Sequence, residues 1–320
     1  MTRLRRLIKP VLSVAFVGCF GWFFYVAFRR NWATLQAHEF HIAPLYLACA
    51  MLATLAAMLL STYAWFTSLN ALSTSHIDFR QSVAAANVSG LSKYIPGKVW
   101  SYALQMYWLD GLGFSKSLVL YVNIVNQLIS MGVSVMLALV CLLFSSVHLP
   151  ATALLASLLG LLVIDAVSIL FSHAVLNGLF ALLGRLLKRR MPVFEVKKSL
   201  LLRLHLVHFV AAVASGVAAY FFCFALGYRI DLAPSLVVIG SSMLGDVAGF
   251  LAFVVPGGLG VREGLMYAML DGQGVASLAL VLPVASRLMN MVVEILLGAV
   301  ALHLLRTLSA RPRARAIDQP

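Results

Sequence analysis

The stretch VPGGLGVREG (Val255 to Gly264) interrupts an apolar region, residues 234–270, that is otherwise long enough for a membrane helix. A second stretch, KYIPGKVW (Lys93 to Trp100), interrupts residues 81–109 in the same way. Proline removes a backbone donor and glycine weakens a helix, so a Pro-Gly pair at each place breaks the helix in two. Apolar pieces of about ten to fourteen residues indicate re-entrant or buried segments. We therefore predict two re-entrant broken-helix hairpins, in which each half is too short to cross a bilayer comfortably.

The rest of the chain is strongly apolar. Of its 320 residues, 62% are hydrophobic and 11% are charged, against roughly 25% charged in an average soluble domain. Apolar stretches of about 18 residues or more recur, which is the length that a helix needs to cross the hydrocarbon core. We predict full spans at about 11–28, 43–70, 118–145, 150–172, 200–226 and 279–305. The predicted fold class is an all-α polytopic membrane protein with about six full spans, forming a single integral membrane domain over residues 1–320.

The basic residues flank the predicted spans. A formal net charge of +13 would indicate nucleic-acid binding only if these residues formed one face of a soluble domain, so no nucleic-acid partner is expected. Most of the 24 lysines and arginines fall on one side of the membrane if both termini are cytoplasmic, as the positive-inside rule requires. Residues 173–199 are then predicted to form a cytoplasmic interfacial helix and a basic loop. A simple span end explains residues 173–190 nearly as well.

An internal repeat relates the two broken regions. Four motifs recur in the same order, about 153 to 161 residues apart: Ile77-Asp78-Phe79 with Ile230-Asp231-Leu232, Pro96-Gly97 with Pro256-Gly257, Asp110-Gly111-Leu112-Gly113 with Asp271-Gly272-Gln273-Gly274, and Ser117-Leu118 with Ser277-Leu278. Repeat 1 covers about 76–146 and repeat 2 about 229–305. The predicted topology makes the copies inverted, and inverted repeats with broken helices build alternating access in transporters. The alternative is that proline and glycine only kink ordinary membrane helices.

Charged residues gather beside the two breaks. An ionisable group near the bilayer centre costs about 2.5–3.5 kcal/mol on insertion scales, so it requires a partner or a function. Basic groups beside the helix N-termini that follow each Pro-Gly are suited to bind an anionic lipid phosphate. The candidate substrate-binding residues are Lys93, Pro96, Gly97, Lys98, Pro256, Gly257, Gly258, Arg262, Glu263 and Arg287. The alternative is a set of internal ion pairs that hold helices together, for example Arg287 with Asp246 or Glu263.

Three carboxylates, Asp165, Asp246 and Glu294, are candidates for coupling or charge balance. Asp165 lies in the middle of a predicted span, where it is either a proton-coupling carboxyl or a group that caps a hydroxyl. His205 and His208 lie three residues apart on one helical face. That spacing suits a metal or a phosphate, but a pair without a third ligand favours interfacial packing. We expect no metal and no cofactor.

The two interrupted stretches, KYIPGKVW and PGGLGVREG (Pro256 to Gly264), resemble the paired signatures of the flippase-like membrane region of lysylphosphatidylglycerol synthases, including its stand-alone members. The resemblance covers nearly the whole chain, and it implies lipid translocation across the bacterial inner membrane. In two-part members, a soluble carboxy-terminal domain transfers lysine from aminoacyl-tRNA to phosphatidylglycerol. Here only Arg306 to Pro320 follow the last predicted span, so this chain is not expected to make the lipid. The stand-alone relatives are associated with several lipids and lipid-linked sugars.

Three functions compete on this evidence. The leading hypothesis is a flippase or transporter, and not an enzyme, for an anionic phospholipid or a polyprenyl-phosphate-linked molecule. The second is a non-catalytic membrane subunit that partners a separate lipid- or glycan-modifying enzyme. The third is a membrane enzyme that acts on a lipid through Asp165, His205 or His208. Besides the lipid itself, such an enzyme and a second copy of the chain remain candidate partners.

Overall fold

The computed structural model describes Tyr25, Arg29 and residues 42–94, 100–147, 150–186, 188–252, 255, 258–271 and 276–309. Every regular element of these described residues is helical, which confirms the predicted all-α class. The elements are α3 (Pro44–Leu72), α4 (Phe79–Gly90), the 3-10 turn η1 (Leu91–Tyr94), α5 (Trp100–Asp110), α6 (Lys116–Leu143), α7 (Ala151–Leu170), α8 (Ser172–Leu186), α9 (Lys198–Ala225), α10 (Leu232–Leu251), α11 (Val261–Leu270) and α12 (Ala276–Ser309).

Six of the described helices are long and apolar enough to cross a membrane: α3, α6, α7, α9, α10 and most of α12. Five of them agree with predicted spans, whereas the predicted span at 11–28 lies, except for Tyr25, outside the described residues. The sixth, α10, corrects the prediction that both halves of the second broken region are too short. With 20 residues, it extends about 30 Å, because the Pro-Gly break comes only after its end and membrane helices tolerate its internal glycines.

The repeated motifs mark equivalent helix ends. Asp78 precedes α4 and forms a capping box with Gln81, whose side chain accepts the Asp78 backbone N–H at 3.0 Å. Asp231 holds the same place before α10. In both copies, a first helix, a break, a short helix and a long helix follow in that order. The described parts of the two segments therefore share this order of helices, and the repeat itself stays a prediction.

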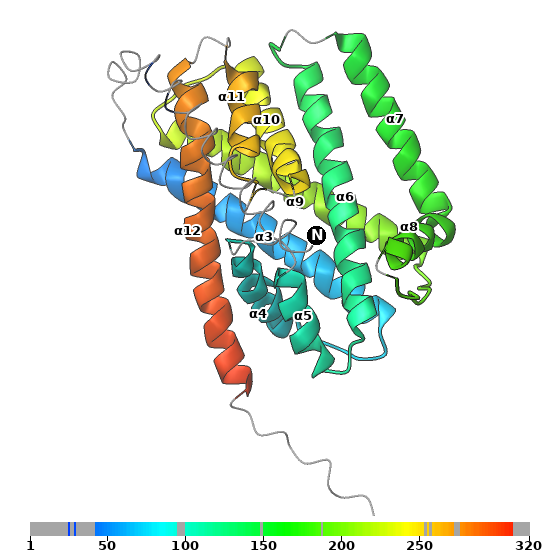
Figure 1. The fold of residues 1–320 in the computed structure, drawn as a ribbon. Coiled ribbons are helices and arrows are strands. Elements are labelled where there is room, and N and C mark those ends of the chain that lie inside the picture. Colours follow the sequence, from blue (N-terminus) through cyan, green and yellow to red (C-terminus); the bar gives the residue numbers. More distant parts are fainter. Residues whose placement is uncertain are drawn as a thin grey trace, which may run out of the picture.

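The two copies pack across one another. Figure 1 shows α4 and α5 toward one end of the bundle and α10 and α11 toward the other, while α6 and α12 run in opposite directions. The long helix of each copy packs on the first helix of the other, α12 on α4 and α6 on α10. The helices that precede the copies, α3 and α9, lie along each other and share the most extensive contact in the described bundle. Through these contacts, each long helix packs against helices of both copies.

Glycines allow the close approach at both exchanged contacts. A Cβ added to Gly298 on α12 would lie 2.7 Å from Leu91 Cδ1. A Cβ added to Gly240 on α10 would lie 3.0 Å from Leu142 Cγ and 3.2 Å from the Ala138 carbonyl oxygen on α6. Small residues at such crossings let membrane helices pack closely. A larger side chain at either position would force the two copies apart.

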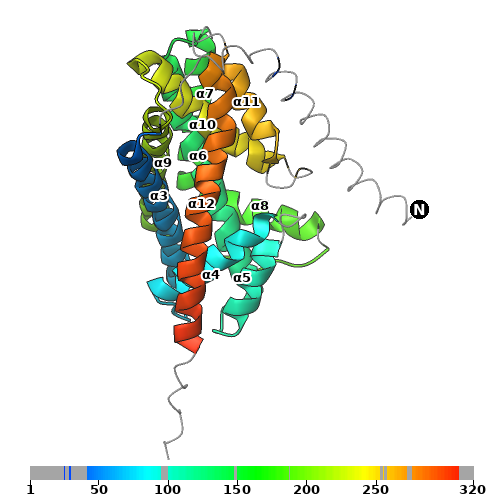
Figure 2. The same ribbon diagram turned by 90° about the vertical axis from the view of Figure 1, so that its left-hand side faces the viewer.

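Helix α8 (Ser172–Leu186) is separate from the preceding span and lies within the region for which an interfacial helix and a basic loop were predicted. A turn at Phe171 separates α7 from α8, and Figure 2 shows α8 running across the direction of α12. Phe180 of α8 is buried while Leu182 is exposed. The following loop is held by Asn177, which exchanges two hydrogen bonds of 2.9 Å with the Phe194 backbone. The placement of this segment on the cytoplasmic side stays a prediction.

Candidate functional site

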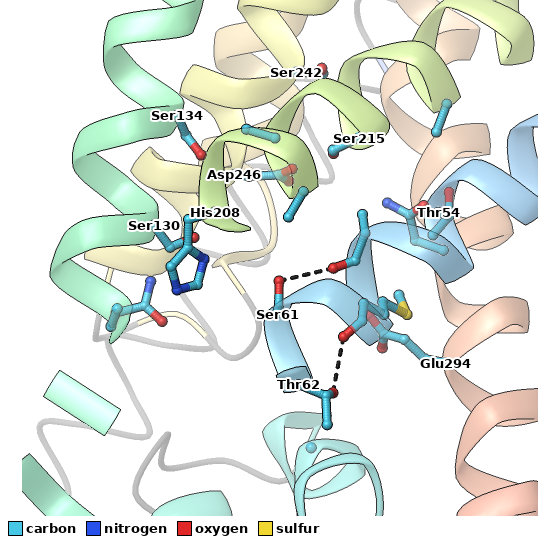
Figure 3. A pocket seen from close by; sticks show the side chains of 18 of the residues that line it. Thr54, Ser61, Thr62, Ser130, Ser134, His208, Ser215, Ser242, Asp246 and Glu294 are labelled. Atoms are coloured by element: carbon cyan, nitrogen blue, oxygen red, sulfur yellow. Dashed lines mark hydrogen bonds between the residues drawn. The ribbon is translucent and has the colours of Figure 1, made fainter. Parts of the chain in front are cut away.

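A polar cavity of about 620 Å³ lies between the two copies and the pair α3 and α9. Its lining comes from all the described helices except α7 and α8. Ligand sites in proteins have volumes of roughly 300–1,000 Å³. Figure 3 shows hydroxyl and carboxyl groups and an imidazole from several helices around this space. The cavity is therefore large enough for a lipid head group and is built from the elements that the repeat predicted.

Most of the polar groups in the lining are uncharged. Six amides and eight hydroxyls face it: Asn87, Gln105, Asn123, Asn126, Gln127 and Asn290, with Thr54, Ser61, Thr62, Ser130, Ser134, Ser215, Ser242 and Ser286. Ser61 and Thr62 each donate to a backbone carbonyl one turn earlier, at 3.0 and 2.9 Å. Their oxygens therefore remain acceptors toward the cavity. Polar groups at this density inside a membrane bundle mark a functional site.

A chain of amides joins the first broken region to α6. Gln105 Nε2 on α5 donates to Ser89 Oγ on α4 at 3.0 Å. Asn123 Nδ2 on α6 donates to Gln105 Oε1 at 2.8 Å. Gln105 thus donates with its NH2 group on one side and accepts with its oxygen on the other, which defines the orientation of its side-chain amide. These residues hold the short hairpin against the long helix of its own copy.

A second chain joins α3, α6 and α9. Asn126 Nδ2 donates to Ser68 Oγ at 2.9 Å, and its Oδ1 lies 3.1 Å from His208 Nε2. Because that amide oxygen can only accept, the proton of His208 lies on Nε2. The His208 side chain, for which interfacial packing was predicted, is buried and lines the cavity.

These amides were not among the predicted site residues, although the sequence carries a signal for them. On α6, residues 123, 126, 127, 130 and 134 are all amides or serines. That spacing of three and four is the period of one helical face. A polar stripe along a predicted membrane span indicates a surface that faces water or polar ligands rather than lipid.

Arg262 lies at the wall of the cavity and binds three helices together. Its Nε donates to Asp246 Oδ1 on α10 at 2.5 Å, and its Nη1 donates to the Pro283 carbonyl at 3.2 Å and to Ser286 Oγ at 3.3 Å on α12. The Arg262 side chain is 9% exposed and the Asp246 side chain is 51% exposed. The carboxylate is thus the accessible partner, and Glu294 lines the same cavity from α12.

Glu263 and Arg287 form a second ion pair, 2.7 Å long, between α11 and α12. Glu263 is 2% exposed, and its other carboxylate oxygen accepts the Gly260 backbone N–H at 2.7 Å. This pair was one of the two named in the ion-pair alternative, which is confirmed for it. The other named pair, Arg287 with Asp246, is replaced by Arg262 with Asp246. Neither Glu263 nor Arg287 is among the residues that line the cavity.

The remaining predicted residues lie at the breaks. Pro96, Gly97, Lys98, Pro256 and Gly257 lie outside the described residues, as does the side chain of Lys93 on η1. Gly258 is described and has φ +67°. A Cβ at Gly258 would collide with the backbone of Gly249 on α10. This glycine is therefore required for the chain to pass close to α10.

Asp165 pairs with His205, and neither residue lines the cavity. Asp165 Oδ1 on α7 lies 2.9 Å from His205 Nε2 on α9, and the two side chains are 28% and 16% exposed. The bonded partner is an imidazole instead of the hydroxyl that was considered. His205 thus connects two helices, where interfacial packing was predicted.

The fold and the cavity define an α-helical polytopic membrane protein with a polar site of ligand size among its helices. The chain belongs to the family described as the lysylphosphatidylglycerol synthase TM region, because the family's sequence model matches residues 10–298. This confirms the resemblance carried by the two interrupted stretches and relates the protein to lipid handling in membranes. No curated protein matches this sequence.

Proposed function

We propose that the protein is a flippase or transporter that moves a phospholipid or a polyprenyl-phosphate-linked molecule across the bacterial inner membrane by alternating access, without changing the lipid chemically. The observation that carries the proposal is the polar cavity built jointly by two cross-packed copies of one helical unit. In transporters with this kind of repeat, the substrate site lies at the interface between the copies. The head group would occupy the cavity while the acyl or prenyl chain stays in lipid.

The lining indicates how a head group would bind. Among the described lining residues, the acidic and basic side chains other than His208 are Arg262, Asp246 and Glu294. One guanidinium and two carboxylates leave no excess positive charge, so amides and hydroxyls supply most of the donors. A phosphate would therefore have to compete with Asp246 for Arg262. That competition discriminates against anions too weak to replace a carboxylate.

The same competition supplies a mechanism for opening. With the cavity empty, Arg262 joins Asp246 of α10 to Pro283 and Ser286 of α12. When a phosphate takes the guanidinium, the link between α10 and α11 is exchanged for a link to the cargo. Helix α11 is then free to move against α10 within the second copy. A ligand shifts the balance between two conformations only through contacts that differ between them. The replacement of Asp246 by a phosphate at Arg262 is such a contact.

The test uses liposomes that hold the purified protein and a head-group-labelled phospholipid. A membrane-impermeant quencher added outside removes the outer-leaflet signal, and translocation exposes the inner-leaflet signal as well. We expect Arg262→Lys and Asp246→Asn to slow this exchange at least several-fold, because each disrupts the ion pair between residues 262 and 246. Lys98→Ala is expected to slow it too. Lys116→Gln, which changes an exposed pair with Asp110, is the matched control.

Normal exchange in folded Arg262→Lys and Asp246→Asn proteins would refute the assignment of this site. Mass analysis of the recovered lipid separates transport from catalysis. An unchanged lipid is expected, and a new chemical species would establish an enzyme instead.

A further inference from the structure

The hydrogen bonds of His205 determine how many protons it shares with Asp165. The Nδ1 atom of His205 lies 2.7 Å from the Leu201 carbonyl oxygen, and Nε2 lies 2.9 Å from Asp165 Oδ1. A carbonyl oxygen only accepts, so Nδ1 carries a proton. A neutral imidazole has one N–H, which leaves Nε2 as an acceptor facing a carboxylate oxygen. Two acceptors do not bond each other, so one more proton lies between them.

This extra proton makes the pair neutral overall. It is either an imidazolium with a carboxylate or a neutral imidazole with a carboxylic acid, and both forms sum to zero charge. Removing the proton leaves one negative charge between two membrane helices. A bare carboxylate at such a depth costs about 2.5–3.5 kcal/mol on insertion scales. The proton therefore stabilises the contact between α7 and α9.

Helix α7 packs mainly on α6 in the described bundle, and few of its side chains are buried. Leu154 is its buried residue, whereas Leu159, Val163 and Ile164 are all more than 60% exposed. Its described neighbours are α6, α8 and α9. Asp165 is the one ionisable residue in α7. Because few side chains of α7 are buried, a change in the protonation of Asp165 and His205 can shift the position of this helix.

The pair is adjacent to the cavity through α9. His208 lies one turn beyond His205 on α9, lines the cavity and contacts Asn126 of α6. Residues three apart on a helix are neighbours, about 5–6 Å between Cβ atoms. His205 is therefore a direct neighbour, on α9, of a residue that lines the cavity.

The other ionisable groups on the packed elements are directed elsewhere. Arg203 of α9 donates to Tyr63 on α3 at 2.8 Å, and Lys116 of α6 binds Asp110 at 3.1 Å. Tyr121 of α6 packs on aromatic rings of α8 and the following loop. The remaining ionisable residues on these elements are Tyr46 and Cys49 of α3, Cys141 of α6, His173 and Arg185 of α8, Lys198, Tyr220 and Cys223 of α9, Asp246 of α10, and Arg287, Glu294 and His303 of the described part of α12. Along α9, the ionisable residues nearest to His205 are Arg203 and His208.

We propose that Asp165 and His205 form a proton-binding site that couples lipid movement to the transmembrane proton gradient, a role that rests on the proposed transport function. In each cycle, one proton enters the pair from one side of the membrane and leaves to the other. After it leaves, the lone pair of Nε2 faces the Asp165 carboxylate, and their repulsion separates α7 from α9. Because α9 packs on α3, α6 and α10 around the cavity, this separation changes access to the head group.

The experiment measures the distribution of labelled phospholipid between the leaflets of proteoliposomes with and without a pH difference. With one proton coupled to each lipid, a gradient of one pH unit gives an equilibrium asymmetry of about tenfold, since one unit is worth 1.36 kcal/mol. A protonophore should abolish that asymmetry. Asp165→Asn keeps a donor toward Nε2 and the contact between α7 and α9 but cannot release a proton, so it should give no asymmetry whatever its rate of exchange. Asp110→Asn, at the exposed pair with Lys116, should behave like the unchanged protein.

The outcomes distinguish the two proposals. Lipid exchange that ignores the gradient in the unchanged protein, or an asymmetry that survives Asp165→Asn, overturns the coupling and leaves the transport function standing. Absence of exchange in the unchanged protein refutes transport itself. Coupling also has a readout independent of lipid. Differential acid–base titration of the unchanged protein against the Asp165→Asn, His205→Gln double variant should reveal two additional titrating protons, the second of them the proton shared by the pair. A difference below two overturns the site.

Discussion

Replacing Glu263 tests whether the second break is held by a buried ion pair. Glu263 is 2% exposed and uses both carboxylate oxygens, one for Arg287 and one for the Gly260 N–H, each at 2.7 Å. Breaking a buried pair by removing one partner costs about 3–5 kcal/mol. We expect Glu263→Ala to lower the free energy of unfolding by that amount. Glu263→Gln keeps an acceptor but loses the charge, so we expect a loss of about 2 kcal/mol.

The double variant is the decisive comparison. In Glu263→Ala with Arg287→Met, neither charge remains to be stabilised in the interior, so the double variant should be more stable than Glu263→Ala alone. The assay is equilibrium unfolding in mixed detergent micelles, with tryptophan fluorescence and circular dichroism as independent probes. If the double variant loses the sum of the two single losses, the two residues do not interact and the described role of the pair is wrong.

Three further predictions concern packing. Gly258→Ala should lower stability by about 2–4 kcal/mol, because it combines a positive φ with a collision against Gly249; a thermal melt in detergent that matches the unchanged protein would contradict this. Gly298→Val should push α12 from Leu91 and lower the yield of folded protein, which size-exclusion chromatography measures. Asn126→Leu removes the amide that joins three helices and should lower stability by about 1–3 kcal/mol, as unfolding in mixed micelles would show.

The all-α class and five of the six proposed spans were predicted from the sequence because these depend on local chemistry. Apolar length identifies a membrane helix, and Pro-Gly pairs beside charges identify a break. The four recurring motifs predicted the equivalence of the two halves, and Asp78 and Asp231 do stand at equivalent helix starts. The length of α10 could not be predicted from its glycines, since the neighbouring helices determine whether a glycine interrupts a membrane helix.

The partners of the charged groups were predicted less well for the same reason. Spacing along the chain indicated that Arg262 and Arg287 needed acidic partners, but it could not assign which carboxylate each would take. That choice depends on how α10, α11 and α12 cross. Likewise, Asp165 and His205 lie 40 residues apart, and only the packing of α7 on α9 brings them together.

The central claim is that a lipid head group passes through the polar cavity, and filling that cavity tests it most directly. Ser130 on α6 lines the cavity, so Ser130→Trp should obstruct it and reduce exchange of head-group-labelled phospholipid in proteoliposomes to the rate of protein-free vesicles. Ser157 on α7 is exposed at the outside of the bundle, so Ser157→Trp should leave exchange unchanged. Undiminished exchange in folded Ser130→Trp protein would contradict a path through this cavity.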